Sequence, residues 1–326
     1  MIDEYNRKID YMRISITDRC NLRCIYCMPG VGIDLTTHEE ILRFDEILTV
    51  VESAACLGMK KIKITGGEPL VRRGVADLIH KIKGISGIEA VTLTTNGVLL
   101  AEQFEQLKTS GLDGINISLD TLDETEFEKI AGVNALPQVL AGIDRVLADQ
   151  KIPLKVNCVP LKSAKTGLGD LLSLAKDRPI HVRFIEMMPI GYGKEYTYIH
   201  EDEIKEMIEN RYGTLKAYKQ KLGFGPCHYY TLEGFQGKIG FISAMSHQFC
   251  SSCNRVRLTS QGYLKSCLQY ELGCDLKPLL RAGATVEEIA KVMAETILIK
   301  PKAHTFCKQD FQENEENKLP MSKIGG

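Results

Sequence analysis

Two groups of closely spaced cysteines stand out in this sequence of 326 residues. The first group has the spacing C-x3-C-x2-C and the second has the spacing C-x2-C-x13-C. Their members are Cys20, Cys24 and Cys27, and Cys250, Cys253 and Cys267. A structural zinc ion and a simple electron-transfer 4Fe-4S cluster each take four protein ligands. Each triplet therefore predicts a metal centre with one open position, where a small molecule could bind and react.

Other readings of the cysteines stay open at this point. Three buried apolar thiols are a weak alternative for the first triplet, whereas a zinc ribbon completed by Cys274 or His247 is a serious alternative for the second. Cys56 and Cys158 lie in apolar runs and are expected in the core. The sequence opens with no charged and apolar leader, and no apolar run approaches the ~18 residues that span a bilayer. We therefore expect a cytoplasmic protein with reduced cysteines.

Composition and charge limit the possible partners. The chain is 44% hydrophobic and 25% charged, which is typical of one large or two medium soluble domains. Its 41 basic and 42 acidic residues give a formal net charge of -1. Because this balance attracts neither nucleic acid nor an anionic membrane, we expect no partner of either kind and look for local charge clusters instead.

The cysteine triplets must be positioned by a repeating pattern of strands and helices. Short β-branched runs are expected to form strands at residues 12–17, 61–65, 90–95, 114–119, 154–159 and 181–186. Helical periodicity follows at residues 45–57, 75–82, 101–108, 137–148 and 168–176. These six β/α units predict a parallel sheet, and their total length is short for the about 250 residues of a full eight-unit barrel. We therefore expect an open or partial barrel.

The pattern changes after residue 189. We expect a helix at 202–211, strands at 214–218, 228–232 and 238–243, a hairpin turning at Gln261 and Gly262, and helices at 276–281 and 286–297. This mixture predicts an α+β extension behind the barrel. We divide the chain into residues 1–235, the barrel, and residues 236–326, a C-terminal region that ends in a flexible Gly-Gly tail.

Basic residues recur on the expected strands with a spacing of two, which places them on one face. Lys61 and Lys63 share the second strand, and Arg13, Lys155 and Arg183 lie on three others. A solvated edge would explain any one of them. Burying several cations without partners is very costly, so the repetition predicts an anionic ligand inside the barrel, and a triphosphate meets that requirement.

Two further segments are expected to line the same site. The second expected strand ends in T-G-G-E-P, where two glycines permit close approach of a ligand and where Glu68 and exposed carbonyls could receive an ammonium group. Arg255 and Arg257 begin two residues after Cys253 and are expected to project beside the second triplet.

The segment C-N-L-R-C-I-Y-C-M-P resembles the cluster motif of the radical S-adenosylmethionine (SAM) enzymes. The second triplet in C-S-S-C-N-R-V-R with Cys267, and the terminal double glycine, resemble the GTP 3′,8-cyclase family of molybdenum cofactor biosynthesis. The similarity covers nearly the whole chain. It implies a partial (β/α)6 TIM-like barrel of radical SAM type, with a C-terminal α+β extension that carries a second 4Fe-4S cluster.

The resemblance also implies roles for individual residues. The first triplet would hold a 4Fe-4S cluster whose free iron binds SAM, and the second an auxiliary 4Fe-4S cluster whose open iron meets guanine. The implied SAM contacts are Tyr26 (through its backbone), Gly67, Ser118 and Met188. The implied GTP contacts are Arg13, Lys61, Lys63, Thr94, Lys155, Arg183, Arg255 and Arg257. Catalytic roles would fall on Arg255, Arg257, Gly325 and Gly326. A member of this family carries Arg where this chain has Lys63, so a bidentate phosphate contact would be lost there.

The implied reaction begins with a 5′-deoxyadenosyl radical that takes hydrogen from C3′ of GTP. Closure of C3′ onto C8 would then give (8S)-3′,8-cyclo-7,8-dihydroguanosine 5′-triphosphate (3′,8-cyclo-GTP). The implied partners are an external low-potential electron donor and a separate cyclic pyranopterin monophosphate synthase that takes the product, and a homodimer is compatible with the family. The alternatives are a peptide-maturing radical SAM enzyme with an auxiliary cluster, and a metal-cluster redox sensor.

Overall fold

The computed structural model describes residues 1–28, 36–306 and 321–325. Within these residues, one sheet runs in the order β12-β11-β10-β1-β2-β3-β4-β5-β6-β9-β8-β7. Its central strands are parallel and follow the chain: β1 (Tyr11–Ser15), β2 (Lys61–Thr65), β3 (Ala90–Thr95), β4 (Gly114–Ser118), β5 (Leu154–Cys158) and β6 (His181–Ile185). The expected strands at 61–65 and 90–95 match β2 and β3 at both ends, and the other four differ by one or two residues. The six-unit parallel core is thus confirmed.

The strands after β6 extend both edges of this parallel core. They are β7 (Lys216–Tyr218), β8 (His228–Thr231), β9 (Ile239–Ile242), β10 (Arg255–Leu258), β11 (Tyr263–Lys265) and β12 (Gly273–Asp275). β9 joins β6 and β10 joins β1, both in parallel. The extension thereby pairs the backbone groups that an open barrel would leave exposed at its two edges. Sequence patterns indicated most of these strands but not β12, nor the pairing of β10 with β1.

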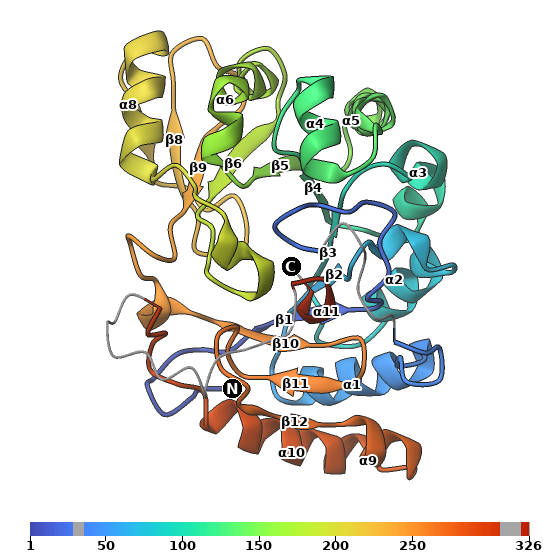
Figure 1. Cartoon of the computed structure of the whole chain (residues 1–326). Coiled ribbons are helices and arrows are strands. Elements are labelled where there is room, and N and C mark those ends of the chain that lie inside the picture. The colour runs from blue at the N-terminus through green and yellow to red at the C-terminus, as the bar shows by residue number, and fades with distance from the viewer. Residues whose placement is uncertain (29–35, 307–320, 326) are drawn as a thin grey trace.

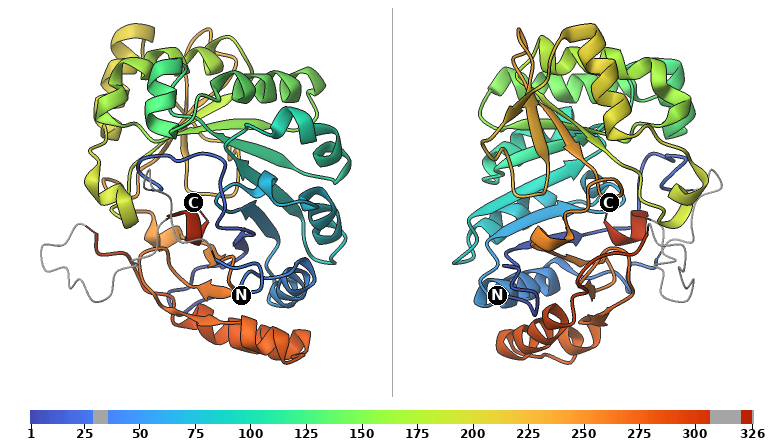
Figure 2. Two further views of the ribbon diagram at one scale, coloured as in Figure 1. Left: turned by 45° about the vertical axis from the view of Figure 1, so that its right-hand side comes forward. Right: turned by 90° about the vertical axis from the view of Figure 1, so that its left-hand side faces the viewer.

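Helices cover the outer side of the curved sheet (Figure 1). The α-helices of the described residues are α1 (Phe44–Cys56), α2 (Val75–Lys83), α3 (Leu100–Thr109), α4 (Glu124–Ala131), α5 (Leu136–Asp149), α6 (Leu168–Leu171), α7 (Ser173–Lys176), α8 (Glu201–Tyr212), α9 (Lys277–Arg281), α10 (Val286–Leu298) and α11 (Met321–Ile324). α9 and α10 lie beyond β12 and α10 packs against α1, whereas α11 lies inside the curve of the sheet (Figures 1 and 2). The expected helix at 168–176 is two short helices, α6 and α7, and α4 was not expected.

The core lies between the sheet and its outer helices. Alternate strand residues such as Met12, Ile64, Leu93 and Ile115 are at most 1% exposed and face this layer. The other strand face carries the polar residues of the sequence pattern and points into the curve. Cys158 is buried as expected.

The prediction that Cys56 lies in the core was wrong. It is exposed, because it ends α1 on the side away from the buried residues Val50, Val51 and Ala54.

No helix in the described part of the chain is both long enough and apolar enough to cross a membrane.

Candidate active site

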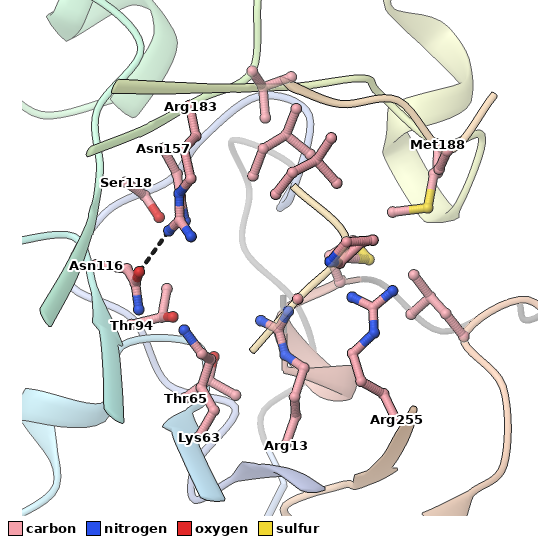
Figure 3. Close-up of a pocket in the computed structure, with 18 of the residues that line it drawn as sticks. Arg13, Lys63, Thr65, Thr94, Asn116, Ser118, Asn157, Arg183, Met188 and Arg255 are labelled. Carbon is pink, nitrogen blue, oxygen red and sulfur yellow. Dashed lines mark hydrogen bonds between the residues drawn. The ribbon is translucent and has the colours of Figure 1, made fainter. Parts of the chain in front are cut away.

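A cavity of about 800 Å³ fills the space inside the curved sheet. All six cysteines of the two triplets line it, and all six are free thiols. It also receives side chains from every strand from β1 to β6, and Figure 3 labels eight of these residues together with Met188 and Arg255. The fold therefore brings together two cysteine triplets that lie more than two hundred residues apart in the sequence.

The first triplet lies on the loop that follows β1. Backbone bonds from Arg23 N to Ala131 O (2.7 Å) and from Ile25 N to Ile130 O (3.0 Å) fix this loop against α4. The Tyr26 hydroxyl donates to Asp120 Oδ2 at 2.6 Å and ties the loop to the end of β4. α4 was unexpected, yet it is one of the supports of the cysteine loop.

The thiols of the first triplet lie close enough to affect one another. Burial raises the pKa of the Cys24 thiol well above its usual range, and the neighbouring thiols of Cys27 and Cys20 raise it further. Three thiolates in this place would repel one another unless a positive centre lay between them. This donor set therefore fits a cationic metal cluster.

The T-G-G-E-P turn presses against the chain just before the first triplet. A Cβ atom on Gly67 would lie 2.4 Å from the Arg19 carbonyl oxygen, so only glycine fits there. Both oxygens of Glu68 are used inside the protein: Oε1 accepts from Leu70 N (2.9 Å) and Thr95 Oγ1 (2.7 Å), and Oε2 accepts from Asn96 N (2.6 Å). Burial raises the Glu68 pKa to about 7. The Glu68 carboxylate is thus a brace between β2 and β3, which leaves backbone groups of the turn as the binding edge.

The predicted cations lie side by side on the lumen face. In the strand register, Arg13 of β1 lies between Arg257 of β10 and Lys63 of β2. Lys63 is 9% exposed and Arg257 is 7% exposed. Burial and the nearby charges of Arg183 and Arg13 hold the pKa of Lys63 well below its usual range, and burial, with Arg183, lowers that of Lys155 to about 8. A lumen lined by this many basic side chains favours the binding of an anion.

Several polar atoms of the lumen have no partner within the described structure. Arg183 donates from Nη2 to Asn116 Oδ1 at 2.5 Å (Figure 3), but its Nε is buried and unbonded. The same holds for Thr92 Oγ1 and Asn157 Oδ1. Because unbonded buried polar atoms are costly, they fit a ligand that is rich in both acceptors and hydroxyl groups, such as a nucleotide.

Lys61 is the one predicted cation that the structure does not bring to this cavity. Its Nζ bonds to Asp10 Oδ2 at 2.7 Å and lies 5.3 Å from the centre of the Phe224 ring. It is absent from the residues that line the cavity within the described part of the chain. The prediction that Lys61 and Lys63 lie on the same face of the strand was correct. Lys61, however, is the first residue of β2, and its ammonium group binds Asp10 there.

The other residues implied by the resemblance lie around the cavity. Tyr26, Gly67, Ser118 and Met188 line it, as does Thr94. Figure 3 shows Met188 and Ser118 on different sides of the central space, with Arg13 and Arg255 below them.

The second triplet surrounds the start of β10 and the end of β11. Cys250 and Cys253 flank a short turn, in which Cys253 N donates to Cys250 O at 3.2 Å, and Cys267 follows β11. Burial alone would raise the pKa of the Cys253 thiol, but the positive charges of Arg255 and Lys300 bring it down to about 7. A thiol that ionises near neutral pH suits a metal ligand.

The fourth ligands of the zinc-ribbon alternative lie elsewhere. Cys274 is on β12, where its sulfur contacts Thr296 Oγ1 at 2.9 Å, and His247 lies at the surface beside Glu201. Among the described residues, no three His, Cys, Asp or Glu side chains are grouped so as to hold a single metal ion.

The end of the chain returns to the lumen. Arg257 Nη1 donates to the Gly325 carbonyl at 2.7 Å, and Ile324 is 1% exposed. Gly325 has φ +79°, and a Cβ atom there would lie 2.9 Å from Thr65 Cγ2. The predicted role of Gly326 concerns a residue outside the described part of the chain.

Some residues of the site carried little or no signal in the sequence. Asn157 shares a strand face with Lys155 and could have been included by that spacing alone. Lys300 is a lysine after an amphipathic helix, yet it is 4% exposed and bonds to the backbone of Arg255 and Ser266, beside Cys253 and Cys267. Only the packing of α10 against the sheet reveals it.

Two family models match the chain. Residues 14–162 match the radical SAM superfamily, and residues 180–306 match Molybdenum Cofactor Synthesis C. Among curated relatives, the chain is 44% identical over 327 residues to a GTP 3′,8-cyclase of Clostridium perfringens, and each chain is covered in full. It is 43% identical over 330 residues to a GTP 3′,8-cyclase of Desulforamulus reducens, again over the whole of both chains.

Solved structures with low identity share the fold. SuiB of Streptococcus suis bound to its precursor peptide SuiA has a TM-score of 0.62 at 15% identity, covering 91% of this chain and 66% of that one. Native anSMEcpe with bound AdoMet has a TM-score of 0.59 at 15% identity, covering 93% and 84%.

Proposed function

The chain belongs to the GTP 3′,8-cyclase family of radical SAM enzymes, and we infer that its central cavity converts GTP to 3′,8-cyclo-GTP in molybdenum cofactor biosynthesis. One observation carries this inference: a single cavity is lined by two cysteine triplets and by basic side chains from β1, β2, β5, β6 and β10. Metal chemistry and nucleotide binding would thereby share one cavity.

We propose that each triplet holds a 4Fe-4S cluster with one open iron position. SAM would bind at the first cluster, against Tyr26, Gly67, Ser118 and Met188. When bound, the first cluster and SAM supply a carbon-centred radical that takes a hydrogen atom from the ribose of GTP. The chain's own part is to hold the reactants in line and to keep water away from them. The Tyr26–Asp120 bond and the Glu68 brace would keep the SAM side of the cavity rigid.

GTP would lie across the lumen, with its base side at the second cluster. Arg13, Lys63, Lys155 and Arg183 would hold the triphosphate, with Thr94 beside them on β3. Arg255 and Arg257 would hold the base side, next to Cys253. Charge-assisted bonds from several strands fix the position of the nucleotide better than one cation could, because each strand is rigid. Lys61 has no part in this arrangement, since Asp10 binds its ammonium group.

The chain end would complete the site. Gly325 is held by Arg257 and packs against Thr65 and Ser15, so it limits the space beside β1 and β2. We propose that Gly325 and Gly326 contact the bound nucleotide and that Arg257 positions them. A larger residue at position 325 would have to displace the side chains around it.

We propose residues 1–235 and 236–326 as the two functional regions: the first would carry the SAM site and the triphosphate contacts, and the second would carry the second cluster and the contacts to the base side of GTP. The second region adds β9 at one edge of the barrel and β10 to β12 at the other. An external low-potential donor would supply the electron, and a cyclic pyranopterin monophosphate synthase would take the product. Two copies of the chain could form a homodimer.

Metal analysis after anaerobic reconstitution tests the two-cluster arrangement. We expect about eight iron atoms and eight sulfides per chain, four of each for each cluster. Replacing Cys20, Cys24 and Cys27 together, or Cys250, Cys253 and Cys267 together, should each remove half. Zinc at the second triplet, or a loss of all iron from either set of changes in a folded protein, would contradict the proposal.

A further inference from the structure

Lys300 lies just beyond α10, and its side chain extends to the backbone beside the second cysteine triplet. Lys300 is 4% exposed and lines the cavity, as do Cys253 and Cys267. Nζ donates to Arg255 O at 3.0 Å and to Ser266 O at 2.6 Å. Arg255 begins β10 two residues after Cys253, and Ser266 directly precedes Cys267. One ammonium group therefore fixes the backbone beside two of the three thiols.

Arg7 also bonds to the backbone of this region but, unlike Lys300, it is paired with a carboxylate. Its guanidinium donates to Cys250 O and Lys302 O, each at 3.0 Å, and its Nε pairs with Asp3 Oδ2 at 2.6 Å. Asp3 thus neutralises Arg7. Within the described residues, Lys300 bonds to carbonyl oxygens and pairs with no carboxylate. Lys300 therefore brings a net positive charge to the second triplet, whereas Arg7 does not.

A buried positive charge has a definite effect on a redox centre. Reduction makes a cluster more negative, so a nearby cation stabilises the reduced form and raises the potential. The effect is strong where water is excluded, because the local dielectric constant is low. We propose that Lys300 is a positioning residue for the second cluster: it fixes the backbone around Cys253 and Cys267, and its charge raises that cluster's reduction potential. This inference rests on the second cluster of the proposed function.

The test is an EPR-monitored redox titration of the full-length chain. Cys24→Ser is the shared background, because it removes the first cluster and leaves one signal. Lys300→Met is the test change, and Lys155→Met is its control. Lys155 also lines the cavity, but it lies on β5 beside Arg183, and four strands separate β5 from β10 in the sheet order. Iron is counted in every sample before titration.

Lys300→Met should keep its iron and move the midpoint to a more negative value. At a fixed applied potential, the ratio of reduced to oxidised cluster should fall about tenfold, or ~59 mV for one electron. Lys155→Met should not move it. An unchanged midpoint in Lys300→Met, or an equal shift in both variants, would overturn the inference.

A loss of iron in Lys300→Met calls for a second variant, Lys300→Arg, which keeps the charge. Recovery of the iron and of the original midpoint supports the role of the charge. Continued loss in Lys300→Arg would assign Lys300 to packing and overturn the inference. If the background protein itself held no second cluster, the proposed function would fail instead, so the two failures are distinguishable.

Discussion

Arg257 donates a hydrogen bond from Nη1 to the backbone carbonyl of Gly325 at 2.7 Å. This bond joins β10, the strand that closes one edge of the barrel, to the end of the described chain. Gly325 adopts φ +79°, and a side chain there would press against Thr65 and Ser15. Both the backbone conformation and the space around it therefore require glycine.

Gly325→Ala should displace the chain end and lower the rate of GTP cyclisation by at least about tenfold, while the iron content stays constant. Gly283→Ala is the matched control, because Gly283 has φ +81° with no atom within 4 Å of the added Cβ. Both changes incur the about 1–2 kcal/mol penalty of a left-handed alanine. Comparable activity of the two variants in a steady-state assay would argue against a role for the chain end.

Lys63→Met should weaken GTP binding by roughly 10- to 100-fold, because a hydrogen bond to a charged group contributes about 1.5–3 kcal/mol. Lys61→Met is the control: it lies two residues earlier on β2, but its ammonium group is bound by Asp10. Calorimetric titration of GTP into both variants gives the comparison. We expect Lys61→Met to change affinity by less than about twofold. Similar losses in the two variants would mean that overall charge, not position, governs binding.

Cys267→Ser should remove the second cluster and abolish cyclisation. Cys274→Ser should retain both clusters, since the Cys274 sulfur contacts Thr296 on α10 and lies outside the cavity lining of the described residues. Iron and sulfide counts with EPR of the reduced protein distinguish the two results. Full iron content in Cys267→Ser would contradict the assignment of Cys267 as a cluster ligand. Loss of iron in Cys274→Ser would assign that role to Cys274.

The affinity for GTP should fall as the pH rises above about 8. In the free protein, burial and Arg183 lower the pKa of Lys155 to about 8. A bound triphosphate stabilises the ammonium form, so the pKa rises in the complex and a proton is taken up on binding above that pH. Lys155→Arg keeps its charge and should show a smaller fall between pH 8 and 9. Equal slopes for the two proteins, measured by calorimetry, would exclude Lys155 from the triphosphate site.

Local sequence patterns predicted the positions of strands and the face of the sheet on which their side chains lie. The alternation of polar and apolar residues located β2 and β3 and placed Arg13, Lys63 and Lys155 on the lumen face. The same rule put Lys61 on that face, but it could not show that Asp10 lies within reach of its ammonium group.

Those local patterns could not predict contacts between segments that are distant in the sequence. The pairing of β10 with β1, the support of the first triplet by α4, and the bonds of Lys300 depend on tertiary packing. The sequence around Lys300 is that of an ordinary helix end. Its role follows only from the place where α10 lies against the sheet.

The central claim is that one cavity directs a SAM-derived radical to the ribose of GTP. The most direct measurement uses GTP with deuterium at C3′, incubated anaerobically with the reconstituted protein, SAM and a strong reductant. The account predicts that 5′-deoxyadenosine gains one deuterium and that 3′,8-cyclo-GTP forms in equal amount. Deoxyadenosine without deuterium, or deuterium transfer without a cyclised nucleotide, would contradict it.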